Sequence, residues 1–445
     1  MGSLKAMLDD SIFAPRKKEA LSGDYFDTTE MRNKMFKLDW GRMDKKPTFI
    51  AFKKKNGLAL EDKETGKLKP TPLLKFYKNT MRTEYDVICN AYTYYICREK
   101  GSPQHAMSQK EFEEFCFHNG LRDCADASKK KFGFMNLTRL FQELNEEPDP
   151  ANKKKKAENA ANDDDALMRF EFLELIIRLS WAFPQSPEPK TQFQGYLMYV
   201  RSNFMREAQL GAIDRNVFRK ERLYTPEVLA VLKAYQEELR TIYTLAVGTD
   251  PGIGKDSPKL SYKKWCWLSE RCEFEDTNLF EGNNLPLACG GIPAQGLHRN
   301  ELTLIFMTSM MMVPDEIKHR DLYNVASFTE FLEALCRVAE SKDLATKEAL
   351  EQFEFMSTVN AIYDAAAQVK AKKKPKIARR PSSEFWANPE KTRSLAERVL
   401  SFLDYMFLKF EPDCGSVLMS TYESAKLLGS LASESKQLYG KVMWA

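Results

Sequence analysis

The feature that most constrains this chain is that its central part repeats. Three short segments recur in the same order along the 445 residues, each about 160 residues after its first copy. Matches that keep their order at a nearly constant spacing indicate an internal duplication more strongly than any single match does. The matched pairs are residues 107–112 with 260–265, 137–141 with 302–306, and 171–178 with 330–337. We therefore predict a fold that contains one unit twice.

The hydrophobic pattern of the repeated region is helical. Apolar residues recur at the i, i+3, i+4, i+7 spacing of an amphipathic helix, and alternating patterns are few. Thr225, Pro226 and Glu227 form a helix start, with a capping threonine, a proline in the first turn and an acid at the positive end of the helix dipole. The residues at helical spacing are Ile88, Ala91, Tyr92, Tyr95, Ile96, Val228, Leu232, Tyr235, Leu239, Ile242 and Tyr243. This predicts an all-α fold.

Each copy has the internal order of an EF-hand, in which a helix is followed by a loop and by an exit helix that begins at a glutamate. The sequence at residues 331–339, echoed at residues 172–180, resembles the exit helix of EF-hand-like proteins of eukaryotic flagella and protist cytoskeletons. The resemblance covers residues 80–345 and implies tandem EF-hand-like units at residues 80–185 and 225–342. Residues 186–224 are then expected to be a linker, and residues 343–445 a helical, basic C-terminal extension.

The loops depart from the calcium-binding pattern. A working loop takes oxygen ligands from positions 1, 3, 5, 7, 9 and 12, with glycine at position 6. The loops that end at Glu111, Lys264 and Glu330 place lysine, isoleucine and histidine at the first ligand position. None of these side chains supplies the oxygen that a hard cation needs. We expect these three loops to bind no calcium.

The loop that ends at Glu171 is the one weak candidate for a metal site. It offers Asn162 and Asp164 in addition to Glu171, but it lacks the carboxylate at position 1 and the glycine at position 6. A calcium sensor with this one atypical loop stays open as an alternative.

Two of the loop-ending glutamates have a simpler explanation. Ser108 with Glu111 and Ser327 with Glu330 both fit the capping box, in which the two side chains satisfy free backbone N–H groups at a helix start. We predict a capping role for both glutamates in place of metal binding.

Residues 1–79 show little sustained periodicity and are expected to form an extended basic arm. Aromatic residues are spaced along this segment as if to dock on a partner, and basic runs accompany them. The residues predicted to bind the partner are Trp40, Lys45, Lys46, Phe49, Phe52, Lys53, Lys54 and Lys55.

The remaining features exclude several classes of protein. No apolar stretch approaches the ~20 residues of a membrane span. The nine cysteines contain no CxxC pair and read as reduced core thiols of a cytoplasmic protein. No nucleophile, base or metal constellation is recognisable, so we expect neither an enzyme nor a cofactor. The basic runs lack interleaved aromatic residues, which argues against a nucleic-acid partner.

Together these features predict a structural, cytoskeleton-associated protein. The resemblance implies an axonemal microtubule of a cilium or flagellum as the lattice, inside or outside the microtubule, with tubulin or other axonemal proteins as partners and no small-molecule substrate. The alternative is a regulatory adaptor whose degenerate EF-hands recruit an enzyme.

Overall fold

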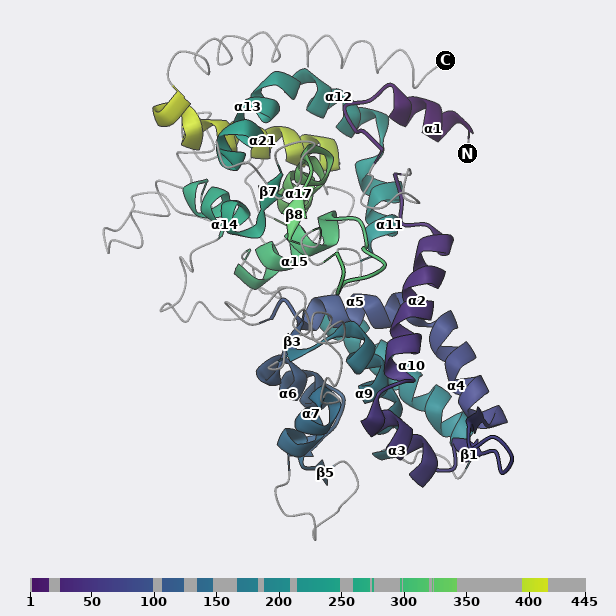
Figure 1. Cartoon of the computed structure of the whole chain (residues 1–445). Coiled ribbons are helices and arrows are strands. Elements are labelled where there is room, and N and C mark those ends of the chain that lie inside the picture. Colours follow the sequence, from purple (N-terminus) through teal and green to yellow (C-terminus); the bar gives the residue numbers. More distant parts are fainter. Residues whose placement is uncertain are drawn as a thin grey trace, which may run out of the picture. The chain divides into compact units, whose positions relative to one another are not determined.

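The structure is a computed structural model of the chain. The residues that it describes are 2–15, 25–98, 106–123, 134–146, 166–182, 188–208, 214–248, 259–272, 274–275, 297, 299–319, 322, 324–341 and 394–414. These residues are mostly helical, with a few short strands, so the prediction of an all-α fold is confirmed (Figure 1).

The N-terminal segment is helical, and the prediction of an extended arm was wrong. Met35 and Trp40 are buried because α2 packs against three other helices, α4, α5 and α9, and Phe49 of α3 is buried as well. A short antiparallel hairpin joins α3 to α4 and pairs Ala59 with Pro70. The elements are α1 (Gly2–Asp9), α2 (Thr29–Met43), α3 (Pro47–Lys55), β1 (Ala59–Glu61), β2 (Leu68–Pro70) and α4 (Pro72–Thr83).

The first copy of the repeat follows directly. Its apolar stripe is buried as predicted, and Phe172 lies at the centre of the packing, with its ring 5.4 Å from that of Tyr92 and 4.8 Å from that of Phe115. The elements are α5 (Tyr85–Tyr95), β3 (Met107–Ser108), α6 (Gln109–His118), β4 (Arg122–Asp123), β5 (Phe134–Met135), α7 (Leu137–Asn145), β6 (Ala166–Leu167) and α9 (Arg169–Ala182).

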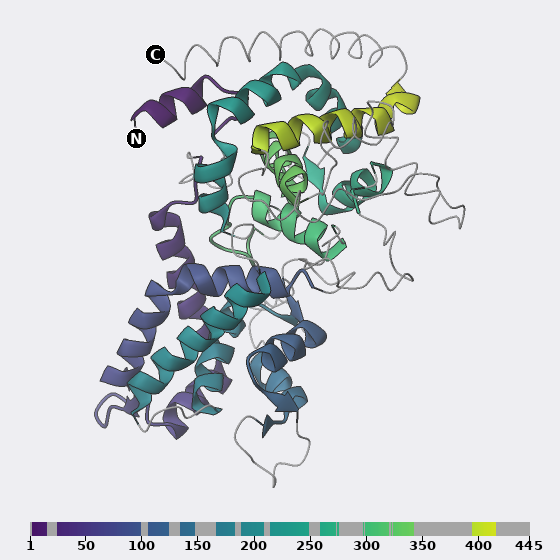
Figure 2. The ribbon, with the colours of Figure 1, turned by 180° about the vertical axis from the view of Figure 1, so that it is seen from behind.

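The segment expected to be a linker contains a long helix. α10 packs against α4 and α9 (Figures 1 and 2). The rings of Tyr77 and Phe193 stack 4.2 Å apart. This helix buries Phe193, Tyr196, Leu197, Val200 and Phe204, so it belongs to the core. The elements are α10 (Pro189–Ala208), α11 (Arg215–Phe218) and the short π-helix η3 (Arg219–Leu223).

The second copy of the repeat begins at the predicted helix start. Thr225 accepts a hydrogen bond from the Val228 amide at 3.4 Å, which confirms its role as a cap. The C-terminal helix α21 lies within the extension that was expected to be helical. The elements are α12 (Pro226–Ala234), α13 (Gln236–Val247), β7 (Leu260–Ser261), α14 (Tyr262–Arg271), α15 (Arg299–Ser309), β8 (Val325–Ala326), α17 (Phe328–Ser341) and α21 (Leu395–Cys414).

The chain divides into two compact units. Unit 1 comprises Met1–Leu229, Thr249–Tyr262 and Arg299–Arg337, and unit 2 comprises Ala230–Gly248, Lys263–His298 and Val338–Ala445. In unit 2 the aromatic rings form the core: Phe274 lies 5.8 Å from Trp265 and 5.2 Å from Phe402. Among the helices described, none is both long and apolar enough to cross a membrane.

Candidate functional site

Two small antiparallel sheets mark the same position in the two copies of the repeat. In the first copy β3 pairs with β6, and in the second β7 pairs with β8. Each of these strands is followed at once by a helix: α6, α9, α14 or α17. Phe172 and Phe331 therefore both lie in the first turns of the helix that follows the second strand. The first and third matched segments therefore occupy equivalent positions relative to these strands, whereas the match at residues 137–141 begins α7 but the match at residues 302–306 lies inside α15.

The predicted capping boxes are present. In the first copy the Ser108 amide donates to the Glu111 carboxylate at 2.9 Å, and the Glu111 amide donates to the Ser108 hydroxyl at 3.3 Å. In the second copy the corresponding distances for Ser327 and Glu330 are 2.8 and 3.4 Å. Both glutamates thus satisfy backbone N–H groups at a helix start, as predicted.

Glu171, the glutamate of the candidate metal loop, is bound by a cation of the protein itself. Its side chain is fully buried, and one carboxylate oxygen accepts a hydrogen bond from Lys46 Nζ at 2.6 Å. The other oxygen accepts a hydrogen bond from the Met168 amide at 2.9 Å. Burial raises the pKa of Glu171 to about 7, although the Lys46 ammonium opposes that shift.

Lys46 is held at this position from several sides. Its ammonium also donates to the backbone carbonyl of Leu144, near the end of α7, and lies 5.6 Å from the centre of the Phe170 ring. Because α7 and α9 flank the loop, the ammonium joins its two ends. A positive charge therefore stands beside the glutamate that would otherwise be the last ligand of a divalent cation.

The second copy closes its loop without that lysine. Glu330 accepts hydrogen bonds from the Met311 amide at 2.9 Å and from the Ser327 amide at 2.8 Å, one on each carboxylate oxygen. The Ser327 hydroxyl donates to the same carboxylate at 2.9 Å. Both oxygens are thus engaged by the chain, as they are in Glu171, but here the Met311 amide takes the place of the lysine ammonium.

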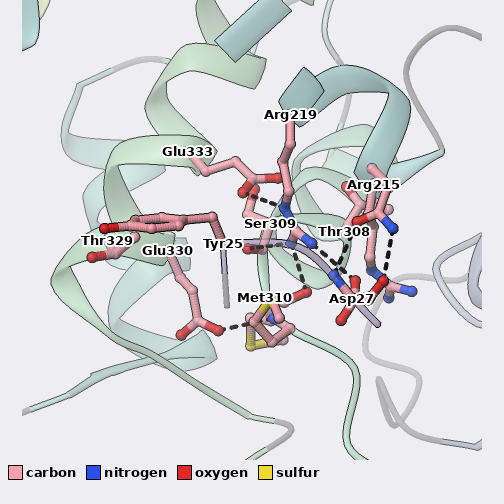
Figure 3. Close-up of polar contacts among 12 residues, drawn as sticks. Tyr25, Asp27, Arg215, Arg219, Thr308, Ser309, Met310, Thr329, Glu330 and Glu333 are labelled. Atoms are coloured by element: carbon pink, nitrogen blue, oxygen red, sulfur yellow. Dashed lines mark hydrogen bonds and ion pairs between the residues drawn. The ribbon is translucent and has the colours of Figure 1, made fainter. Parts of the chain in front are cut away.

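A buried arginine ties the loop ends of the second copy together. Arg219, at the start of η3, donates to Glu333 and to Asp27, each at 2.9 Å, and its guanidinium also reaches the carbonyls of Ser309 and Met310 (Figure 3). Burial alone would lower the pKa of Arg219, but the two carboxylates outweigh it and the pKa is raised. Arg219 thus joins the end of α15 to α17, as Lys46 joins α7 to α9.

The last helix of each copy carries the same internal ion pair. Arg178 donates to Glu174 at 2.8 Å in α9, and Arg337 donates to Glu333 at 3.0 Å in α17. Each guanidinium also stacks on an aromatic ring from an earlier helix: Phe52 at 5.2 Å for Arg178, and Phe218 at 4.1 Å for Arg337. The same ion pair and ring contact therefore recur in α9 and α17.

One network joins the two copies within unit 1. Arg169 at the start of α9 donates to Asp39 on α2 at 2.6 Å, and its amide donates to Glu316 at 3.0 Å, beyond the end of α15. Burial raises the pKa of Glu316 to about 7, although Arg169 opposes that shift. Arg42 pairs with the neighbouring Asp315 at 2.6 Å. These contacts place the first turn of α9 against the loop that precedes α17.

The remaining loop of the second copy ends at a lysine, as the sequence indicated. Lys264 donates to the carbonyl of Val247, the last residue of α13. A cation that donates to a helix-terminal carbonyl satisfies an acceptor the helix cannot satisfy itself. Here the residue in the place of a ligand carboxylate repels metal ions, because it is positively charged.

The residues predicted to bind a partner fall into two groups. Trp40, Lys46, Phe49 and Lys53 are buried, and Phe52 is half-buried against Trp181, at a ring distance of 6.4 Å. The prediction was wrong for these four because their side chains are buried in the folded body. Lys53 Nζ, for example, donates to Asp44 at 2.5 Å.

The other predicted lysines are exposed. Lys45 and Lys55 lie on the surface, and Lys54 pairs with Glu61 of the hairpin at 3.1 Å. These three side chains are accessible to a partner, but they do not form one cluster with the buried aromatic residues. The predicted combination of an apolar anchor and adjacent cations is therefore absent from this described segment.

Two of the three residues proposed for a metal loop, Asn162 and Asp164, lie outside the described residues. The third, Glu171, is engaged by Lys46. Within the part of the chain that the structure describes, no group of three or more His, Cys, Asp or Glu side chains is placed to hold a metal ion.

Sequence reasoning missed the buried cations of this site. Lys46 and Glu171 are 125 residues apart, Arg219 and Glu333 are 114 apart, and Arg169 and Asp39 are 130 apart. Periodicity and capping are local signals and carry no information about such pairs. One signal was available: Glu174 with Arg178 and Glu333 with Arg337 recur at identical spacing in both copies.

Comparison of the chain with models of protein families, with curated proteins and with solved structures finds no match.

Proposed function

We propose that this chain is a calcium-independent, non-enzymatic interaction protein built on two tandem EF-hand-like units. Four loop-and-helix segments, joined in pairs by the β3–β6 and β7–β8 sheets, support this reading, because paired EF-hands share such a sheet between their loops. The sequence at residues 331–339 and 172–180, which resembles flagellar and cytoskeletal EF-hand-like proteins, supports the same reading.

The observation that carries the proposal is the internal closure of the loop-ending glutamates. Glu171 is bound by Lys46 Nζ at 2.6 Å, and Glu330 by the Met311 amide at 2.9 Å. A calcium sensor must release these carboxylates to the ion, and sensors use the resulting change in helix angle as their output. An EF-hand-like pair whose loop glutamates are already hydrogen-bonded by the chain keeps one arrangement of its helices at any calcium concentration. Such a unit is suited to a permanent structural contact.

The partner that we propose is an acidic protein polymer, with the axonemal microtubule as the leading candidate. The chain carries a formal net charge of +4, and its exposed lysines are spread over helices packed into a folded body. Docking is then between folded surfaces, and the N-terminal helices are part of the body that docks. Electrostatic association of this kind falls as salt increases.

The experiment is cosedimentation of the purified full chain with taxol-stabilised microtubules, with and without millimolar calcium, across a salt series. We expect binding that weakens with salt and is the same with calcium and with a chelator. Binding that requires calcium would contradict the structural role and favour a sensor. Absence of binding, together with copurification of the chain with a soluble enzyme, would favour the adaptor.

A further inference from the structure

The helix α4 presents a row of positive charge on its outer face. Lys75, Lys78 and Arg82 are exposed and follow the i, i+3, i+7 spacing of one helix face, and α4 contains no acidic residue. The same helix buries Leu74, Tyr77 and Met81 one position earlier in each turn. Because these three residues are packed into the core, the helix cannot rotate, and the three cations stay on its exposed side.

Helix α2 adds a fourth cation to this row. Asn33, Lys37 and Trp40 share one stripe of α2 at i, i+4, i+7. Arg82 Nε donates to Asn33 Oδ1 at 3.0 Å, and Lys78 Nζ lies 5.5 Å from the centre of the Trp40 ring. The later α4 residue contacts the earlier α2 residue, so the two helices run antiparallel. Lys37, which is exposed, lies on its stripe between these two contacts.

We call Lys37, Lys75, Lys78 and Arg82 the α2–α4 basic face. Few carboxylates accompany it on these helices. Asp39 is buried and bound by Arg169, and Glu84, at the end of α4, pairs with Arg201 at 3.4 Å. Glu30, one turn before Asn33, is the exposed acid of α2. Four exposed cations on α2 and α4 thus face one exposed carboxylate of these helices, so the face carries a net positive charge.

The dimensions and chemistry of this face fit a short acidic peptide. Lys75 and Arg82 are seven residues apart, or about 10 Å along a helix at 1.5 Å per residue. An extended peptide covers that length with about three or four residues at 3.3 Å each. Stacking of nucleic-acid bases needs an exposed ring, and the ring at this face, Trp40, is 5% exposed. Lysine ammonium groups act as point charges and suit separate carboxylates.

We propose that the α2–α4 basic face binds a carboxylate-rich peptide segment displayed by a protein partner. This inference rests on the proposed function and deepens it, because it names the surface through which an acidic lattice is held. The face is separate from Glu171 and Glu330, so binding there leaves the closed loops unchanged.

The test measures anisotropy of a fluorescein-labelled hexaglutamate peptide titrated with the full chain. The face variant removes three charges (Lys37→Gln, Lys75→Gln and Lys78→Gln) and retains Arg82, which bonds to Asn33. The control variant removes three exposed charges elsewhere (Lys63→Gln, Lys67→Gln and Lys233→Gln), so both variants have the same net charge.

We expect the face variant to bind the peptide about eightfold more weakly than the wild type, taking a factor of about two for each exposed ion pair. The control should stay within about twofold, and wild-type binding should weaken as salt increases. Equal weakening in both variants would show a general effect of net charge and overturn the inference. So would tighter binding of a single-stranded oligonucleotide at the same salt.

Microtubule cosedimentation with the same variants separates this inference from the proposed function. Pelleting of the wild type and the face variant to the same extent, without peptide binding, would keep the proposed function and overturn the inference. Peptide binding that is lost in the face variant, without pelleting of the wild type, would keep the inference and remove the microtubule as the partner.

Discussion

In each copy of the repeat the chain itself hydrogen-bonds a loop-ending glutamate, but the donors differ between the copies. In the first, the ammonium of Lys46 neutralises Glu171, and Lys46 comes from the α2–α3 junction, outside the matched segments. In the second, the backbone amide of Met311 serves Glu330 from within the loop itself. A backbone donor survives any substitution except proline, whereas a side-chain donor is lost with a single change. The first copy is therefore the one whose loop chemistry depends on a distant residue.

A second difference concerns the cation that joins the loop ends. Lys46 pairs with one carboxylate, whereas Arg219 pairs with Asp27 and Glu333 and also reaches two carbonyls. A guanidinium holds several acceptors in fixed directions, and an ammonium acts as a point charge. In the second copy, therefore, more of the buried polar contacts depend on one residue.

The largest effect should follow the loss of Arg219. Arg219→Met leaves Asp27 and Glu333 buried without their shared cation, and breaking such a network costs roughly 3–5 kcal/mol. Urea unfolding monitored by circular dichroism measures the loss. The control is Arg139→Met, which removes an exposed pair with Glu143 and should cost less than about 1 kcal/mol. Equal costs for the two variants would contradict the central role of Arg219.

Lys46→Met should have the next largest effect, on the order of 3 kcal/mol, because it leaves a single buried carboxylate without its cation. The double variant Lys46→Met with Glu171→Gln should recover part of this loss, since the amide carries no charge and its oxygen can still accept from Met168. Unfolding of the two single variants and the double variant gives the coupling energy. Strict additivity would show that Lys46 and Glu171 do not depend on each other.

The pH dependence of stability should identify Glu171 directly. Its folded-state pKa of about 7 lies above the ordinary value of 4.5, so between these two pH values the folded state binds more protons than the unfolded state. Stability from this group is present below about pH 4.5 and is lost as the pH rises toward 7.

The Glu171→Gln variant lacks that titration. Its stability relative to the wild type should therefore increase from pH 4.5 to 7, by a difference on the order of 2 kcal/mol. Unfolding measured across this pH range tests the sign. A relative stability that is flat or falls over the same range would contradict the burial argument.

The smallest effects are expected at the capping serines, where the two copies agree. Ser108→Ala and Ser327→Ala each remove the hydroxyl that accepts the amide of the third helical residue, at a cost of about 1 kcal/mol. Similar losses in thermal unfolding would confirm that the caps are equivalent. A loss at one serine alone would break the correspondence between the two copies.

The sequence predicted the local features well and the long-range ones poorly. The stripe from Ile88 to Ile96, the helix start at Thr225 and both capping boxes are determined by residues within one or two turns, so periodicity reveals them. The ion pairs of Lys46, Arg169 and Arg219 join residues more than 100 positions apart. Nothing in a local pattern distinguishes a lysine with such a partner from a solvated one.

The N-terminal segment, which was wrongly predicted to be an extended arm, shows the same limit of local sequence patterns. Its basic residues and singly spaced aromatics have the composition of a segment that binds in extended form. Trp40 is buried because α4, α5 and α9 pack against α2, and Phe49 of α3 is buried as well. An arm and a packed helical pair can share one composition, and the difference lies in surfaces contributed by residues far along the chain.

The most direct test of this account is isothermal titration of the full chain with calcium at millimolar concentration, with Glu171→Gln as the matched variant. Sensor loops bind at about 10⁻⁷–10⁻⁵ M. We predict no specific heat for either protein, because Lys46 and the Met311 amide already bind Glu171 and Glu330. A stoichiometric site of micromolar affinity in the wild type that disappears in Glu171→Gln would contradict the claim that these loops are closed.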